Sequence, residues 1–256
     1  MGKGVTSVEP AIAQLQQWIN QAKTITFFTG AGISTESGIP DFRSQNGLYK
    51  QNMSFADVVS RPFFERRPKE FWPLFKEIFR IKMLHQYKPN PGHEFIASME
   101  KNGKETYVIT QNIDGLHQDA GSSRVYEIHG TIKSARCPKC QASYDLAYLN
   151  EQELPRCQTI TRNGNECHFI LKPNVVLFGD SIHHFEEAAE AAINSDLFIV
   201  MGSSLEVTPI NQIPLFVRKQ GTIPMVIINR DATHFDHLFD LVISESIGHT
   251  VSKLQT

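Results

Sequence analysis

The sequence predicts an α/β protein: a parallel β-sheet with helices on both faces, carrying a smaller inserted unit. Short, continuously apolar runs alternate with helical patterns along most of the chain. Continuous apolar runs are typical of strands buried on both faces, and their alternation with helices is the pattern of a parallel sheet. The cysteines, in contrast, all fall between residues 137 and 167, which indicates a separate small unit.

Composition limits the classes of partner that the chain can have. Its 256 residues hold 25 basic and 27 acidic side chains, so no net field attracts nucleic acid or an anionic membrane. No apolar run approaches the roughly 20 residues of a membrane-spanning helix, and the first nine residues lack a hydrophobic signal segment. We therefore expect a cytoplasmic protein that binds neither nucleic acid nor membrane, without an added targeting domain. The oligomeric state stays open.

Helices are predicted where apolar residues recur at helical spacing. The first begins at Pro10, whose fixed φ suits a helix start. Residues 55–87 are rich in Phe, Lys and Arg, and prolines such as Pro73 interrupt them, so we expect several short helices there. Two later helices are predicted at 186–193 and within 208–220.

Strands are predicted at the apolar runs, which lie at 25–28, 107–110, 175–178, 197–201, 225–228 and 241–243. Four of these runs end in glycine or polar clusters: Gly30-Ala31-Gly32, Gln111-Asn112, Gly202-Ser203-Ser204 and Asn229. In open α/β sheets the ligand lies beyond the carboxyl ends of the strands. If the strands are parallel, these clusters converge on one nucleotide site.

The turn after the first strand is a candidate phosphate-binding loop. Gly30 and Gly32 let backbone N–H groups approach a phosphate, because glycine has no Cβ. The G-A-G sequence opens a dinucleotide-binding pattern, but Thr35 stands where that pattern has its third glycine. Alone, the loop predicts some nucleotide without specifying its chemistry.

The cysteines follow the pattern C-x2-C-x16-C-x9-C, which predicts one structural zinc ion. Cys137 and Cys140 form a two-residue knuckle that aims both thiolates at one tetrahedral ion, and Cys157 and Cys167 complete the set. The second pair is widely spaced, so His168 is an alternative fourth ligand. Basic and acidic residues nearly balance within 131–171, which argues against a nucleic-acid-binding zinc ribbon.

Three further side chains admit both a chemical and an ordinary structural interpretation. His129 has an unperturbed pKa near 6.5 that suits a general base, but most of the ten histidines should be core or surface residues. Asp114 could bind a ligand or cap a helix. Arg43 could hold a phosphate or form an ion pair.

The order of the motifs resembles that of the sirtuins, the NAD-dependent protein deacylases, in a bacterial-type form consisting of the catalytic core. The resemblance is carried by GAGISTESGIPDFR at 30–43, TQNIDGLH at 110–117, His129-Gly130, the paired cysteines, KPNVVLFGD at 172–180, GSSLEV at 202–207 and Ile228-Asn229. These motifs occur in the family's order and cover nearly the whole chain. Thr35 in place of a third glycine is what this resemblance expects.

The resemblance implies a Rossmann-like NAD-binding domain and a small domain. The Rossmann-like domain would comprise 1–45, 90–130 and 172–256. The small domain would consist of a helical insert at 46–89 and a zinc-binding insert at 131–171. Residues 37–43 would start a mobile lid that orders when NAD and substrate are both bound.

The resemblance also assigns roles in a deacetylation that yields nicotinamide, free lysine and O-acetyl-ADP-ribose. After the acetyl oxygen displaces nicotinamide and an O-alkylimidate forms, His129 would act as general base on a ribose hydroxyl. Asn112 would orient that hydroxyl or a water, while Ile113 and Asp114 would hold the nicotinamide carboxamide. The residues implied in NAD binding are Gly30, Ala31, Thr35, Asp41, Phe42, Arg43, Gln111, Asn112, Ile113, Asp114, Gly202, Ser203, Ser204, Asn229, Ser246 and Ile247.

Acetyl-lysine proteins are the implied partners. The substrate would add a strand between 179–181 and 204–207, with the Val176 carbonyl accepting the acyl-lysine N–H. Phe178, Gly179, Asp180 and Val207 complete the implied substrate site. Relatives that prefer succinyl-lysine carry Tyr-x-x-Arg in the helical insert, and residues 75–80 lack that pair, so we expect a deacetylase rather than a desuccinylase.

Three other functions compete with this interpretation. A mono-ADP-ribosyltransferase could use the same site, but relatives specialised for that reaction can lack the catalytic histidine. A hydride-transferring dehydrogenase would want the third glycine and an acidic residue about 20 positions on. The motifs do not distinguish the enzyme from a non-enzymatic NAD sensor or zinc interaction module, because an intact site can also serve for binding alone.

Overall fold

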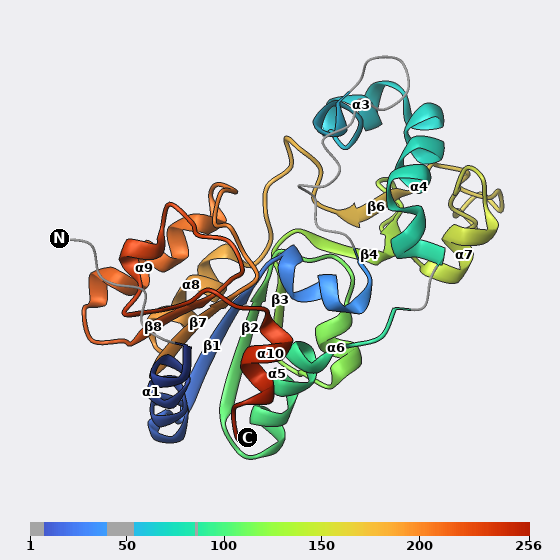
Figure 1. Ribbon diagram of the computed structural model, residues 1–256. Coiled ribbons are helices and arrows are strands. Elements are labelled where there is room, and N and C mark those ends of the chain that lie inside the picture. Colours follow the sequence, from blue (N-terminus) through green and yellow to red (C-terminus); the bar gives the residue numbers. More distant parts are fainter. Residues whose placement is uncertain (1–7, 40–53, 85–86) are drawn as a thin grey trace.

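The computed structural model describes residues 8–39, 54–84 and 87–256, which form two sheets with their helices (Figure 1). In Figure 1 the smaller sheet lies to the upper right of the larger one. The first and last described helices both pack on the larger sheet. The predicted lid starts at 37, and its residues 40–43 lie outside the described residues. The predicted site residues Asp41, Phe42 and Arg43 therefore also lie outside the described residues.

The larger, six-stranded sheet is parallel throughout, as the sequence predicts. Its strands are β1 Thr24–Thr29, β2 Glu105–Thr110, β3 Val125–Glu127, β7 Leu197–Met201, β8 Met225–Ile228 and β9 Leu241–Ile243. The order is β3-β2-β1-β7-β8-β9. This is the Rossmann order, in which the winding direction reverses between the first and fourth strands of the sheet, here β1 and β7. β3 was not predicted, because its sequence Val-Tyr-Glu is not an apolar run and all three residues are only partly buried.

Helices cover both faces of this sheet, and alternate residues of β1 define the two cores. Phe27 packs in one core with α1 Val8–Gln21, α5 Pro91–Lys101 and α10 Ile247–Ser252. Phe28 packs in the other core with α8 Phe185–Ile193 and α9 Ile213–Gln220, preceded by η4 Ile210–Gln212. The remaining short helices near this sheet are η1 Ala31–Ser37, α6 Leu116–Ala120 and η5 Asp236–Leu238.

The smaller unit is an antiparallel sheet packed against helices. Its strands, β4 Gly130–Arg136, β5 Ser143–Asp145 and β6 Lys172–Val175, run in the order β5-β4-β6. The helices are α2 Phe55–Val58, α3 Arg61–Arg66, α4 Pro68–Leu84 and α7 Leu146–Glu151. Trp72 of α4 joins helix and sheet segments, because its ring is fully buried and its Nε1 donates to the Leu171 carbonyl at 2.8 Å.

The structure corrects the predicted strand at 175–178. The strand found here, β6, ends at Val175 and pairs antiparallel with β4, so it belongs to the small sheet. The residues that follow it are paired with the helical insert: Phe178 N donates to Val59 O and Arg61 N donates to Phe178 O, both at 2.9 Å. A local apolar run does not reveal which sheet will accept it.

Pro73 does not end a helix, contrary to the prediction of short helices between prolines. It lies inside α4, which continues to Leu84. An internal proline costs a helix about 3 kcal/mol. Phe71, Trp72 and Phe75 flank it and are at most 1% exposed, and burying each large side chain stabilises the fold by about 1.5–3 kcal/mol. Tertiary packing thus outweighs the local break.

At the point where the sheet reverses direction, the turns after β1 and β7 touch through their backbones. Gly32 N donates to Gly202 O at 2.9 Å. A Cβ on Gly202 would lie 2.4 Å from Ile33 N, and a Cβ on Gly30 would lie 2.8 Å from Gly202 O. Gly202 also has a φ of +65°, a conformation that favours glycine. The glycines are therefore required for this backbone contact, independently of any role in ligand binding.

We predict that Gly202→Ala destabilises the protein far more than Gly221→Ala. Both glycines have positive φ, so each alanine costs about 1–2 kcal/mol of backbone strain. Only at position 202 does the new Cβ meet backbone atoms, whereas nothing lies within 4 Å of it at position 221. Denaturant unfolding should show a further loss of at least about 2 kcal/mol for Gly202→Ala. Equal losses for the two variants would refute a backbone contact at this site.

Candidate active site and metal centre

The predicted convergence of polar clusters at one sheet edge is confirmed. Gln111, which follows β2, donates from its backbone N to Thr29 O at 3.0 Å and from its side-chain Nε2 to Ser203 Oγ at 2.9 Å. The first bond reaches the end of β1 and the second reaches the end of β7. One residue thus links three strand ends through its backbone and its side chain, and the candidate site lies at the carboxyl edge around the β1–β7 switch point.

A chain of hydrogen bonds fixes the glycine turn to the segment after β2. Asn112 Nδ2 donates to Gly30 O at 3.1 Å and to Ser34 Oγ at 3.0 Å. The Ser34 hydroxyl in turn donates to Asp114 Oδ2 at 2.8 Å, and Asp114 Oδ1 accepts from Leu116 N at 3.1 Å. Asn112 and Ser34 are buried, so this network holds both segments in one geometry.

His129 stands between β3 and β4 with one ring nitrogen fixed and the other available. Its Nδ1 lies 3.0 Å from the carbonyl oxygen of Gln111. Because a carbonyl can only accept, we assign the proton to Nδ1, which leaves the Nε2 lone pair for a reacting group. Burial lowers the pKa of His129 below its ordinary value, and the bond to Gln111 opposes this only in part. At neutral pH the ring is therefore an uncharged base.

Two buried histidines behind the site are also uncharged. His117 Nε2 lies 2.9 Å from Thr29 Oγ1 at the end of β1, and the rings of His117 and His93 are 4.8 Å apart. Burial lowers the pKa of His93 to about 4, although the Asp114 carboxylate opposes the shift, and burial lowers the pKa of His117 well below its usual range. Neither ring adds positive charge near the strand ends at neutral pH.

The other predicted NAD-binding residues are distributed along the same edge. Ala31 and Thr35 lie in η1, and the Thr35 hydroxyl donates to Gly32 O at 2.9 Å. Asn229 follows β8, and its Nδ2 donates to Asp231 O at 2.7 Å. Ser246 caps α10 by accepting from His249 N at 3.3 Å. Four further residues of the predicted set make no side-chain hydrogen bond within the described part of the chain. They are Gly202, Ser204, Ile113 and the buried Ile247.

The predicted substrate residues lie on two exposed segments. Phe178 is 55% exposed and Val207 is 46% exposed, and both are large apolar side chains. Gly179 is exposed, and Val176 N donates to His129 O at 2.9 Å, which places that segment beside the candidate base. Asp180 instead accepts from Lys172 Nζ at 2.7 Å and from Leu177 N at 3.0 Å, so its carboxylate stabilises the turn.

Sequence reasoning missed three residues that hold the glycine turn. Ser34 is the centre of the network described above. Asn90 Nδ2 donates to Ile33 O at 2.7 Å, and the Glu36 carboxylate accepts from Gly248 N at 2.9 Å. Asn90 precedes a Pro-Gly pair and caps α5, and this pattern is recognisable in the sequence. The pattern does not indicate which distant residue the Asn90 side chain contacts.

The four cysteines form one cluster whose geometry fits a zinc ion. Their Sγ atoms all lie within 4.8 Å of one another, with Cys137 to Cys167 at 3.8 Å and Cys140 to Cys157 at 3.4 Å. A tetrahedral zinc with Zn–S bonds of about 2.3 Å separates its sulfurs by roughly 3.8 Å. The adjacent His168 is exposed and its Nδ1 lies 3.4 Å from the Glu166 carboxylate. The structure thus gathers the predicted cysteines, not His168.

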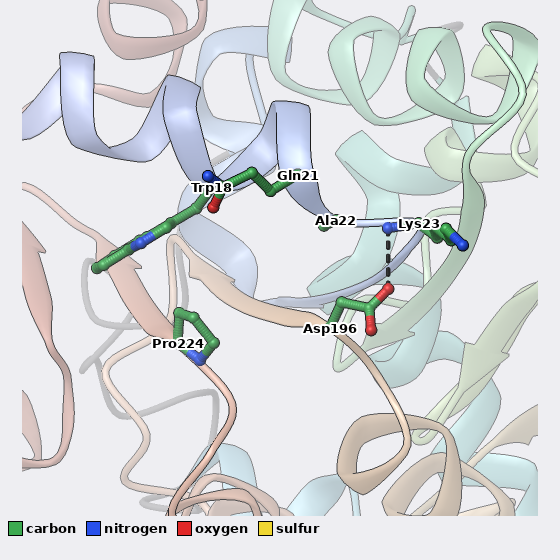
Figure 2. A pocket seen from close by; sticks show the side chains of 6 residues that line it. All are labelled: Trp18, Gln21, Ala22, Lys23, Asp196 and Pro224. Atoms are coloured by element: carbon green, nitrogen blue, oxygen red, sulfur yellow. Dashed lines mark hydrogen bonds between the residues drawn. The ribbon is translucent and has the colours of Figure 1, made fainter.

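A cavity of about 290 Å³ lies at the opposite edge of the large sheet. Figure 2 shows its lining residues, which are Trp18, Gln21, Ala22, Lys23, Asp196 and Pro224. Asp196 accepts from Lys23 N at 2.8 Å, the bond drawn there, and from Thr24 N at 2.9 Å. These residues precede β1, β7 and β8, so the cavity is separate from the carboxyl edge where the candidate base lies.

Comparison with known proteins places relatives along almost the whole chain. The model of the Sir2 family matches residues 30–209. NAD-dependent protein deacetylase 2 of Geobacillus kaustophilus is 48% identical over 245 residues, which are 95% of this chain and 96% of that protein. NAD-dependent protein deacetylase of Chromobacterium violaceum is 47% identical over 251 residues, which are 98% of this chain and 100% of that protein.

Solved structures give the same result for the fold. A Sir2 structure with a p53 peptide and NAD+ is 36% identical, with a TM-score of 0.79. Another, with a deacetylated p53 peptide and 3′-O-acetyl ADP ribose, is 34% identical, with a TM-score of 0.81. Each comparison covers 94% of this chain and 96% of the other.

We predict that Cys167→Ala loses bound zinc while His168→Ala retains it. A four-thiolate site that loses one ligand binds zinc much more weakly, whereas the imidazole of His168 points to Glu166. Metal analysis of the purified variants measures the zinc content per chain. Full zinc in Cys167→Ala together with loss in His168→Ala would reverse the assignment of the fourth ligand.

Proposed function

This chain belongs to the Sir2 family, and from that membership we propose which of its residues perform the reaction. It is an NAD-dependent protein-lysine deacetylase that forms nicotinamide, deacetylated lysine and O-acetyl-ADP-ribose. The observation that carries our assignment is the orientation of His129, which has a bonded Nδ1, a free Nε2 and a lowered pKa at the carboxyl edge of the sheet.

His129 is the general base in this proposal. NAD, once bound, supplies the ribose and the leaving nicotinamide. His129 Nε2 then takes the proton of a ribose hydroxyl as that oxygen attacks the acyl carbon. The Gln111 carbonyl stabilises the resulting imidazolium, because the Nδ1–H bond at 3.0 Å strengthens when the ring becomes charged. Gln111 thereby connects the base to Ser203 and the end of β7.

Asn112 keeps the glycine turn in place to receive NAD. Its Nδ2 is committed to Gly30 O and to Ser34 Oγ, so we assign it a positioning role on the turn in addition to the predicted contact with the ribose hydroxyl or a water. Ala31 and Thr35 on η1 would contact the phosphates and the neighbouring ribose. Ile113 and Asp114 would hold the nicotinamide carboxamide.

Acetyl-lysine in proteins is the substrate class. The substrate backbone would pair with 179–181 and 204–207, where Phe178 and Val207 expose apolar surface for it to cover. Phe178 N and O are already paired with the helical insert, so only the other edge of its segment is open to a peptide. Main-chain pairing of this kind gives little discrimination among substrate sequences.

The division into domains and the cellular location are part of the same proposal. We keep the predicted division into a Rossmann-like domain of 1–45, 90–130 and 172–256 and inserts at 46–89 and 131–171, but move the boundary at 172 past Val175, because β6 pairs with β4 in the small sheet. Within the described ranges, no helix is both long and apolar enough to cross a membrane. We propose a cytoplasmic enzyme without a nucleic-acid partner.

A mono-ADP-ribosyltransferase is the second candidate function. It would use the same NAD site but transfer ADP-ribose to a protein. The presence and orientation of His129 favour deacylation, because transfer to a protein nucleophile does not require a base on the ribose hydroxyl.

We predict peptide-dependent release of nicotinamide from NAD and an acetyl-lysine peptide, at a rate reduced at least about 100-fold by His129→Ala. Mass spectrometry follows the peptide and O-acetyl-ADP-ribose, while chromatography follows nicotinamide. His237→Ala serves as the matched control, because His237 is exposed on η5, and should retain wild-type turnover.

Each product identifies a different function. ADP-ribose bound to protein would indicate the transferase, and NADH would indicate hydride chemistry. No turnover would favour an NAD sensor. A succinyl peptide that reacts faster than the acetyl peptide would contradict the expected acyl preference.

We predict that kcat/KM falls on the acid side through a pKa below 6.5. The base must be uncharged to act, and burial lowers the pKa of His129 in the folded protein. Lowering the pH therefore leaves kcat/KM unchanged until it approaches that lowered pKa, and activity is lost only below it. An acid limb centred above pH 6.5 in the wild type would show that another group, or a differently placed histidine, limits the reaction.

A further inference from the structure

We infer that Lys133 is a positioning residue for the turn at 113–115 and thereby controls how nicotinamide binds and leaves. The inference rests on the proposed function, which assigns Ile113 and Asp114 to the nicotinamide carboxamide. Lys133 lies on β4, the central strand of the small sheet, yet its ammonium reaches residues of the NAD-binding domain. No motif singled it out.

Lys133 and the residue before it contact both ends of the turn at 113–115. Lys133 Nζ donates to the Gly115 carbonyl at 3.3 Å and to both carboxylate oxygens of Asp119 on α6, at 2.7 and 2.8 Å. The preceding residue, Ile132, donates from its backbone N to Ile113 O at 3.0 Å. Two consecutive residues of β4 therefore bind the backbone on either side of Asp114.

Gly115 is shaped to the lysine. Its φ is +71°, and a Cβ at this position would lie 2.6 Å from Lys133 Cε and 2.7 Å from Nζ. The lysine side chain thus fills the space above Gly115, and the missing side chain there gives it room. A side chain at position 115 would therefore displace the lysine ammonium from its contacts.

The side chain of Asp114 is fixed from the other direction. Its two carboxylate oxygens accept from Ser34 Oγ and from Leu116 N. Ser34 holds the side chain of Asp114, and β4 holds the main chain on either side of it. The backbone groups of this turn are therefore kept in one orientation. A ligand amide that binds to this turn would therefore sense a change at Lys133, although Lys133 does not touch it.

Lys133 also balances charge beside the base. Burial raises the pKa of Glu127, and attraction to Lys133 is among the effects that oppose this shift. Glu127 ends β3, two residues before His129. The ion pair with Asp119 is itself exposed, at 41% and 45% of the two side chains, so it contributes little to folding stability. The role that the geometry supports is placement of the turn.

The test compares Lys133→Met, Lys133→Arg and Lys69→Met in the zinc-bound full-length protein. Lys69 is an exposed lysine of α4 in the same small unit and serves as the matched control. We expect Lys133→Met to raise the inhibition constant of nicotinamide about tenfold, the size of a lost hydrogen bond to a charged group. Exchange of labelled nicotinamide into NAD should change in parallel, with the KM for the acetyl peptide within about twofold of wild type.

Lys133→Arg should restore most of the wild-type behaviour, because arginine keeps donors at this position, and Lys69→Met should resemble wild type. Amide hydrogen exchange of the segment 112–117 should become faster in Lys133→Met, whereas β8 should remain protected. Unchanged amide exchange in 112–117, or a uniform loss of every kinetic constant, would overturn the inference. If the wild type released no nicotinamide with peptide, the proposed function would fail, and amide exchange alone would then decide for or against the positioning role.

Discussion

The contact between the turns after β1 and β7 is the constraint on which the rest of the site depends. The two backbones approach so closely that a Cβ on Gly202 would lie 2.4 Å from Ile33 N. This contact sets the start of η1, and η1 carries Ser34, Ala31 and Thr35. A parallel sheet that reverses its winding leaves a crevice at this point. Here the two turns meet at that point through their glycines, beside the polar residues that follow β2.

Hydrogen bonds then transmit this geometry to the base. Asn112 connects the glycine turn to the segment after β2, and Gln111 connects the same segment to Ser203 and to His129 Nδ1. Burial has a double effect along this path, because it strengthens the hydrogen bonds and lowers the histidine pKa values. The result is an uncharged imidazole, the base in our proposal, whose Nδ1 is held by a main-chain carbonyl instead of by an acidic partner.

The small unit reaches the candidate site through β4, although its cysteine cluster lies at the far end of that strand. His129 immediately precedes β4, and a Cβ on Gly130 would lie 1.9 Å from Asn174 O of β6. The strand pairing therefore passes directly beside the base. The cysteine cluster holds the sheet together, and the sheet holds the histidine and the turn at 113–115. A metal without an open coordination position can in this way support catalysis that it does not perform.

The sequence by itself determined the parallel sheet, the polar strand ends, the cysteine set and, through its resemblance to a family, the chemistry. These features depend on local periodicity and on spacing, which are properties of neighbouring residues. Only the tertiary structure decided that β6 joins the small sheet, that α4 continues through Pro73, and that Ser34, Asn90 and Lys133 hold the site. Each of these depends on a partner distant in the chain, and the free energy of such a contact leaves no mark on the local sequence pattern.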